Sequence, residues 1–209
     1  MSLVRVFSDL GQLIIRNIGD NGGPRADRVS AEFDSIIAWA KDAPRCIHRN
    51  ITATGTITTG LDSLHSFSLP ANSLATNGDW VRFRYAGNLA SNDNQKRLQI
   101  SIDSQVLENT GLIDIDAGWF KVDGTYTRLT ATTVFAEATV SFGFLNQLDG
   151  AAAQSGSSLR LISRNASPTV ANLTSSAVTL LVQAETDGVA GGGTNDIVQN
   201  LSIIELCQQ

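Results

Sequence analysis

Hydrophobic and polar residues alternate along most of the chain after residue 60. In the stretch VRFRYA (81–86), valine, phenylalanine and tyrosine alternate with two arginines, and this period of two predicts a strand with one buried face. Further strand candidates are 64–69, 98–103, 119–122, 126–135, 138–144, 159–163, 178–184 and 197–206. Turn residues such as NGD (77–79) and DG (123–124) separate them. The pattern therefore predicts an all-β fold over 61–209, an antiparallel jelly-roll-like sandwich of about eight or nine strands.

A different period occurs near the N-terminus. Apolar residues recur there at the spacing of one helix face, and they are Val29, Phe33, Ile36, Ile37 and Ala40. This spacing predicts one short amphipathic helix over 27–41, which Pro44 prevents from continuing. An apolar stretch over 3–18 precedes it and is expected to be an extended arm. We therefore expect residues 1–45 to form an N-terminal arm and helix, and residues 46–60 to form a linker.

The predicted helix is too short to be stable alone in water, so its apolar face must pack against something. The sequence leaves three partners open: the β domain, another copy of the chain, or a different protein. The residues expected to form this partner-docking surface are Phe33, Ile36, Ile37 and Ala40.

The charge and the apolar runs of the chain argue against two kinds of partner, nucleic acids and membranes. The chain carries 15 Lys and Arg against 20 Asp and Glu, and its lysines are the widely separated Lys41, Lys96 and Lys121. No basic patch follows from this distribution, so we expect no nucleic-acid partner. No apolar run approaches the roughly 18 residues of a membrane span, so we expect no membrane insertion.

Side chains suited to catalysis or metal binding are few. Cys46 and His48 are two residues apart on an extended segment, but two ligands do not make a zinc site. His65 shares a strand face with apolar neighbours and is predicted to be a packed or edge histidine rather than a base. Asp114 and Asp116 have the DxDxG spacing of a calcium loop without the remaining ligands. We therefore expect no catalytic residue, no cofactor, no bound metal and no enzymatic activity.

Several short phrases in the β region resemble a module of tailed-bacteriophage virion proteins. The phrases are SLPANSLATNGD (68–79), Arg82 with Gly87, NDNQK (92–96) with its Asn92, Asn94 and Lys96, GW (118–119) and NDIV (195–198). In those modules a strand ends in a phrase like SLPANTL, an NGD turn follows, and the module closes near NDIV. The segment ADRVSAEFDSIIAWA (26–40) is similar to a helix near the start of many phage tail-fibre and tail-spike proteins, where it docks on the particle.

The resemblance implies a non-enzymatic structural component of a bacteriophage virion. Its simplest form is a short tail fibre or tail-associated appendage or adaptor, anchored by its N-terminal segment and assembled in the host cytoplasm. It implies a homotrimer that contacts other virion proteins of the tail or capsid. The alternatives are a head fibre or capsid decoration protein, or a glycan-binding module for receptor recognition and host attachment; a glycan depolymerase is a third class.

Four side chains bear on these alternatives. Trp80 and Trp119 both lie beside turns and are the candidates for stacking on a host surface glycan. Arg82 and Arg84 are predicted to share one face of a strand. Two interpretations of these arginines stay open, ion pairs between subunits and solvated side chains on an outer sheet.

Overall fold

The computed structural model describes residues 43–103, 105–115, 117–144, 158–169, 173, 175–188 and 193–208, together with Asp34; for residue 144 and residues 158–169 it describes the backbone. The chain divides into two compact units, residues 1–43 and 44–209. In the first unit, Asp34 is helical and exposed. The rest of the predicted helix lies outside the described residues, and so do the predicted docking residues Phe33, Ile36, Ile37 and Ala40.

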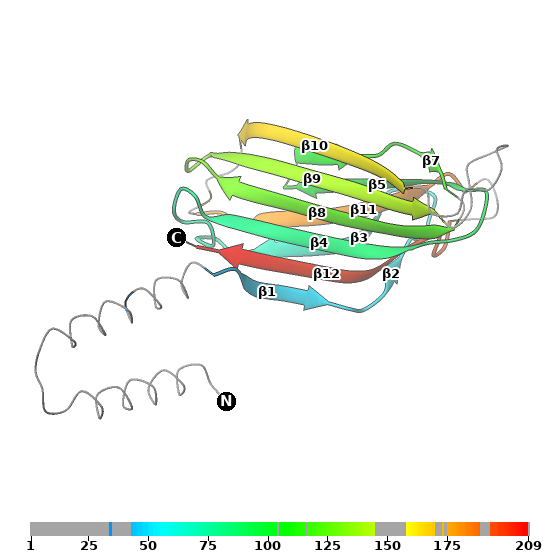
Figure 1. Cartoon of the computed structure of the whole chain (residues 1–209), viewed down its shortest axis with the longest axis horizontal. Helices are drawn as coiled ribbons and strands as arrows, with labels where there is room; N and C mark the ends of the chain where they lie inside the picture. Colours follow the sequence, from blue (N-terminus) through cyan, green and yellow to red (C-terminus); the bar gives the residue numbers. More distant parts are fainter. Residues whose placement is uncertain are drawn as a thin grey trace, which may run out of the picture. The chain divides into compact units, whose positions relative to one another are not determined.

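The second unit is a sandwich of two antiparallel β-sheets (Figure 1). The first sheet contains, in spatial order, β1 (Arg45–Asn50), β12 (Ile197–Cys207), β4 (Trp80–Leu89), β8 (Gly118–Arg128), β9 (Thr133–Phe144) and β10 (Ser158–Thr169), with β2 (Thr54–Gly55) beside β12. The second contains β3 (Asp62–Leu69), β11 (Val178–Thr186), β5 (Gln95–Ile102) and β6 (Gln105–Asn109), with β7 (Ile113–Asp114) beside β5. The prediction of an antiparallel β-sandwich is confirmed.

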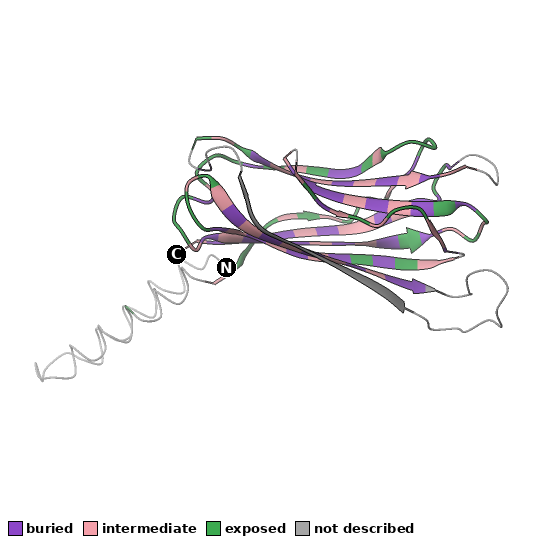
Figure 2. Cartoon of the chain, turned by 90° about the horizontal axis from the view of Figure 1, so that it is seen from above, coloured by how far each residue is buried: buried purple, intermediate pink, exposed green. Residues whose placement is uncertain are grey.

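Burial alternates along the strands, as Figure 2 shows by colour. In β4 the side chains of Val81, Phe83 and Tyr85 are buried while Arg82 and Arg84 between them are partly exposed, which confirms the pattern predicted for 81–86. The facing sheet contributes buried side chains from β3, β5 and β11, and these include Leu69, Leu98, Ile100, Ile102, Leu180 and Val182. Both inner faces therefore meet in one hydrophobic core.

The described residues form more strands than the sequence predicted. β1 and β2 lie in or beside the range 46–60, which was predicted as a linker, and both pair antiparallel with β12. The sequence of β1, RCIHRN (45–50), does not alternate, and most of its residues are exposed. Backbone pairing with β12 holds β1 in place, so this strand does not need a regularly buried face. Its sequence therefore lacks the hydrophobic alternation by which a strand is recognised.

The prediction of a turn at residues 123–124 is wrong. β8 runs without a break from Gly118 to Arg128, and Gly124 lies directly opposite Phe83 of β4. A Cβ atom on Gly124 would lie 2.1 Å from the Phe83 ring, so the glycine makes room for an aromatic side chain within the sheet. The turn between β8 and β9 comes later, where the Thr130 and Thr133 hydroxyl groups are 2.6 Å apart.

A buried polar cluster, which we call the Asp196 network, lies past the C-terminal end of β4. The Asp196 carboxylate accepts hydrogen bonds from the side-chain amides of Asn92 (2.7 Å) and Asn94 (2.6 Å). It also accepts one from the Thr186 hydroxyl (3.0 Å). The Lys96 ammonium donates to the Asn92 side-chain oxygen (2.9 Å) and to two backbone carbonyl groups (2.8 Å each). Asn92 thus connects a cation and an anion that are 1% and 5% exposed.

A second cluster, which we call the Arg128 network, lies at the opposite end of β4. The Arg128 guanidinium donates to the Leu74 carbonyl oxygen (2.6 Å) and to the Asn77 side-chain oxygen (3.2 Å). The Asp79 carboxylate accepts a hydrogen bond from the backbone N–H of Thr76 (2.7 Å). These bonds hold the irregular segment between β3 and β4 against the end of β8, and they satisfy polar groups that burial would otherwise leave unpaired.

Candidate functional site

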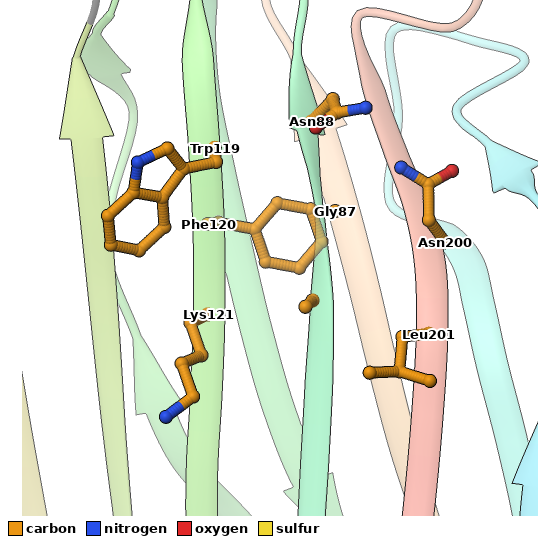
Figure 3. Close-up of a pocket in the computed structure, with 8 residues that line it drawn as sticks. Gly87, Asn88, Trp119, Phe120, Lys121, Asn200 and Leu201 are labelled. Atoms are coloured by element: carbon orange, nitrogen blue, oxygen red, sulfur yellow. The ribbon is translucent and has the colours of Figure 1, made fainter. Parts of the chain in front are cut away.

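A hollow of about 330 Å³ lies on the outer face of the first sheet, across β8, β4 and β12 (Figure 3). Its lining residues are Ala86, Gly87, Asn88, Trp119, Phe120, Lys121, Asn200 and Leu201. Pockets that bind small ligands usually have volumes of roughly 300–1,000 Å³ and an apolar lining with a few polar groups. The hollow falls at the small end of that range, and its lining has this composition.

Gly87 of β4 is among the residues that line the hollow. Gly87 of β4 lies directly opposite Phe120 of β8. A Cβ atom on Gly87 would lie 2.5 Å from the Phe120 ring and 2.0 Å from the Val198 carbonyl oxygen, so no larger residue fits there without a shift of the backbone. The fully buried Phe120 ring therefore occupies the space on the core side of Gly87.

Trp119 of β8 lies at the edge of the hollow, and its indole points toward β9 (Figure 3). Trp119 lies directly opposite Gly143 of β9, and a Cβ atom on Gly143 would lie 2.2 Å from the indole ring. The indole therefore lies over Gly143, which it buries, while the Trp119 residue itself stays 46% exposed. The pairing of an aromatic ring with a cross-strand glycine gives a supported ring that still faces solvent.

An irregularity in β12 forms the opposite wall. The pairing of β12 with β4 shifts between Gln199 and Leu201, so Asn200 is an extra residue in β12. Asn200 and Leu201 consequently both line the hollow, although neighbouring residues of a regular strand point to opposite faces. With Asn88 of β4, two side-chain amides border the same space (Figure 3).

The charged side chains beside the hollow are paired. The Lys121 ammonium lies 2.6 Å from one carboxylate oxygen of Asp123, and the Arg84 Nε lies 3.3 Å from the other. The Arg82 guanidinium lies 3.8 Å from the Glu205 carboxylate. Arg82 and Arg84 thus share a partly exposed face, as predicted, and both have partners within the chain. A second, more polar hollow of about 270 Å³ lies among Arg82, Arg84, Asp123, Gly124, Thr125, Glu137 and Thr139.

The two tryptophans proposed as glycan contacts differ in their surroundings. The guanidinium carbon of Arg82 lies 5.5 Å from the centre of the Trp80 ring, within the range of a cation–π contact. Trp80 is only partly exposed, and the Arg82 contact occupies its ring. Trp119 is more exposed than Trp80, and its indole lies over Gly143 rather than against an arginine.

The two histidines meet across the sandwich. His48 of β1 and His65 of β3 have their Nε2 atoms 2.9 Å apart. His48 also packs against Phe67, and His65 packs against Tyr85, each pair with its ring planes tilted. Burial, with a further contribution from His48, lowers the pKa of His65 to about 4. His65 is thus a packed histidine, as predicted, and its contact with a histidine of another strand was not foreseen.

The other residues weighed as possible metal ligands, Cys46, His48, Asp114 and Asp116, do not form a site in the described ranges. Cys46 is exposed, and its thiol donates to the His48 carbonyl oxygen (3.4 Å) rather than facing the imidazole. Asp114 lies in β7, and Asp116 lies outside the described residues. Among the described residues, no group of three or more His, Cys, Asp or Glu side chains is placed to hold a metal ion. The same part of the chain contains no helix with the length and apolar character needed to span a membrane.

Comparison with protein-family models gives no match, and comparison with curated proteins gives none. Among solved structures, the chain is similar to the CBM2 module of the evolved Dit of Lactobacillus casei BL23 phage J-1. The similarity covers 69% of this chain and 69% of that chain, with 13% sequence identity and a TM-score of 0.27. A similarity this distant assigns neither a ligand nor a function.

Proposed function

We propose that this protein is a non-enzymatic structural component of a bacteriophage virion, and that it is a short tail fibre or tail-associated appendage anchored by its N-terminal segment. The observation that carries the proposal is the position of the phrases that resemble phage virion modules. NDNQK (92–96) and NDIV (195–198) are about a hundred residues apart in sequence, yet Asn92, Asn94 and Asp196 meet in the Asp196 network.

The first phrase of the resemblance has a similar structural role. SLPANSLATNGD (68–79) supplies the carbonyl and side-chain oxygens that the Arg128 guanidinium binds. Buried, hydrogen-bonded polar groups are costly to lose, so such residues are expected to persist in a module that many proteins share. This placement supports the interpretation that the phrases mark a common framework rather than a chance similarity.

We further propose that the sandwich is a jelly roll with an added hairpin. Four strands can be set aside, namely β2, β7, β9 and β10. The remaining strands have the order β1-β12-β4-β8 in the first sheet and β3-β11-β5-β6 in the second. Among these eight strands the first and the last are neighbours, and the chain changes sheets at every connection except that between β5 and β6. Two Greek keys wound together produce this order, and the fold suits proteins that present flat faces to neighbours in an assembly.

The proposal includes a homotrimer that contacts other virion proteins, within a particle assembled in the host cytoplasm. A binding role rather than a catalytic one is supported by the engagement of the outer-face ionic groups: Lys121 and Arg84 pair with Asp123, and Arg82 pairs with Glu205. Carboxylates held in ion pairs on a flat sheet face are poorly suited to general acid–base catalysis.

The test is incorporation into particles. Purified virions are probed with an antibody to residues 44–209, by immunoblot and by gold labelling in the electron microscope. We expect label on the tail, and we expect Ile36→Asp to abolish incorporation while the purified variant keeps its β-sheet circular dichroism. Ser35→Asp, at a position outside the predicted apolar face, is the matched control. Absence of the protein from particles contradicts the proposal, and label on the head replaces the tail assignment with a head fibre or decoration protein.

A further inference from the structure

We propose that the side chains of Lys96 and Asn92 join in an intramolecular amide bond, formed once in each folded chain within the Asp196 network. This is a self-modification without turnover, and it stands whether or not the protein is part of a virion. Three observations carry it: a buried amine in contact with a carboxamide, a carboxylate on the nitrogen that would leave, and an exit for ammonia.

The lysine amine lies against the carbonyl group that it attacks. The Lys96 Nζ is 2.9 Å from the Asn92 side-chain oxygen. Hydrogen bonds to the backbone carbonyl oxygens of Asn94 and Ile115, 2.8 Å each, hold Nζ in this position. Reacting groups that are held in contact behave as if at very high concentration, which removes much of the barrier. The fold therefore positions this amine and this carboxamide before any bond forms.

Burial prepares the amine for the attack. Lys96 is 1% exposed, so its side chain has almost no contact with water. Burial disfavours the charged form of a lysine, and only the neutral amine has the electron pair that attacks a carbonyl carbon. The other lysine among the described residues, Lys121, is exposed and paired with Asp123. Of these two, Lys96 is the lysine placed for amide formation.

The Asp196 carboxylate contacts the nitrogen that leaves. One of its oxygens accepts a hydrogen bond from the Asn92 amide nitrogen at 2.7 Å. The other accepts from the Asn94 amide nitrogen (2.6 Å) and from the Thr186 hydroxyl (3.0 Å), which fixes the carboxylate in place. A carboxylate beside the carbon under attack takes up the proton that the amine releases and passes it to the departing nitrogen.

The reaction balances without an oxidant or a second substrate. A C–N bond forms between the Lys96 Nζ and the side-chain carbonyl carbon of Asn92, and the original C–N bond of the Asn92 carboxamide breaks. The lysine ammonium and the carboxamide thus give a secondary amide and one free ammonium ion, so the total charge is conserved. Asn92 is partly exposed, so the released ammonia reaches solvent.

The experiment is mass spectrometry of the full chain, first intact under denaturing conditions and then after digestion with trypsin. We expect the intact chain to be lighter than its sequence by one molecule of ammonia. Trypsin does not cut after an acylated lysine, so we expect a peptide covering 85–97 that is lighter by the same amount. An unmodified chain gives the peptide 85–96 instead.

The peptide map also separates this bond from a succinimide, which forms from an asparagine with the same loss of mass. A succinimide at Asn92 leaves the Lys96 amine free, so trypsin still cuts after it, and hydroxylamine opens the ring. The amide bond to Lys96 resists both treatments. Fragmentation of the peptide 85–97 then locates the link between the two side chains.

Three variants test the roles of the residues. Lys96→Arg keeps a cation in the same place but has no amine to acylate, so we expect the full mass. Asp196→Asn keeps the shape of the side chain and removes the carboxylate, and we expect amide formation to slow by about a hundredfold, as for the loss of general acid–base catalysis. Lys121→Arg is the matched control, in which the loss of ammonia is retained.

Circular dichroism establishes that each variant is folded, and if Asp196→Asn fails to fold, the comparison of Lys96→Arg with Lys121→Arg decides. The proposal is overturned if the wild-type chain has the full mass of its sequence and is cut after Lys96. It is also overturned if folded Lys96→Arg still loses ammonia from the segment 85–97. Equal rates in the wild type and in folded Asp196→Asn overturn the part assigned to Asp196.

Discussion

Asn92 shows how a single side chain decides whether a buried charge is tolerated. Its amide nitrogen donates to the Asp196 carboxylate, and its side-chain oxygen accepts from the Lys96 ammonium. Burying either ion alone would cost several kcal/mol, and the amide between them satisfies both at once. The network therefore fixes the loop after β4 against the start of β12 more firmly than apolar packing of such short residues would.

The first prediction at this scale concerns Asp196. Asp196→Ala leaves the amides of Asn92 and Asn94 without their carboxylate acceptor in a buried place, and it is expected to lower the free energy of unfolding by roughly 3 kcal/mol. Asp93→Ala is the matched control, since Asp93 is exposed in the same loop and its loss should cost about 0.5 kcal/mol or less. Urea denaturation measures both, and equal stabilities of the two variants would contradict a structural role for the network.

At the scale of elements, β1 connects the two sheets at one edge of the sandwich. It is an edge strand that pairs only with β12 in the described part of the first sheet, and it carries the chain from residues 1–43 into the sandwich. Its His48 side chain reaches across to His65 and Phe67 of β3, which is an edge strand of the second sheet. The histidine pair therefore joins the two sheets along one open side of the sandwich.

The second prediction follows from the low pKa of His65, which burial and His48 hold at about 4. In the unfolded chain the pKa is about 6.5, so the unfolded state takes up a proton between these values and the folded state does not. Stability should therefore fall by up to about 3 kcal/mol as the pH drops from about 6.5 to about 4.

Chemical denaturation at neutral pH and at about pH 4.5 measures this loss. His65→Phe keeps an aromatic ring next to Tyr85 and removes the titrating group, so the part of the loss that belongs to His65 should be absent in the variant. An NMR titration that places the pKa of His65 near 6.5 in the folded protein would be incompatible with this account.

At the scale of the whole molecule, the second compact unit contains both sheets and the shared core. Residues 44–209 form this unit, and its described core residues all come from within it. A unit with its own core is expected to fold alone.

The third prediction is that removal of residues 1–43 leaves the melting temperature unchanged within about 3 °C, because the truncation removes no described core residue. Differential scanning calorimetry of the full chain and of residues 44–209 makes the comparison. A loss of cooperative unfolding in the shorter chain would mean that the N-terminal residues complete the fold.

The fourth prediction concerns the proposed trimer. Ile51 and Ile57 lie between β1 and β3 and are 69% and 72% exposed, which makes them the most exposed large hydrophobic residues among those described. Exposed apolar side chains become candidates for contacts between chains when they gather into one patch, and the test is whether these two do so. We expect the native mass of residues 44–209 to be that of a trimer, and Ile51→Asp with Ile57→Asp to reduce it to a monomer. Leu129→Asp, on the loop after β8, is the matched control, and a monomeric wild type would contradict the trimer.

The local pattern determined the sandwich and much of its core. The alternation in 81–86 and 98–103 depends only on the two-residue period of a strand, so it predicts strands and their buried faces without knowledge of any neighbour. Trp119 and Trp80 were singled out only because both lie beside turns, and the exposure of Trp119 came from the structure. The local pattern failed for β1, whose pairing with β12 is a backbone interaction, and for Gly124, which looked like a turn residue.

Only the tertiary structure decided where the hollow and the pair of histidines lie. The hollow combines residues of β4, β8 and β12, and the extra residue Asn200 of β12 lines it beside Leu201. The contact between His48 and His65 likewise needs two edge strands of different sheets to meet. A sequence specifies the period of each strand locally, whereas register, bulges and contacts between sheets depend on which distant strands pair, because each is set by packing across the core.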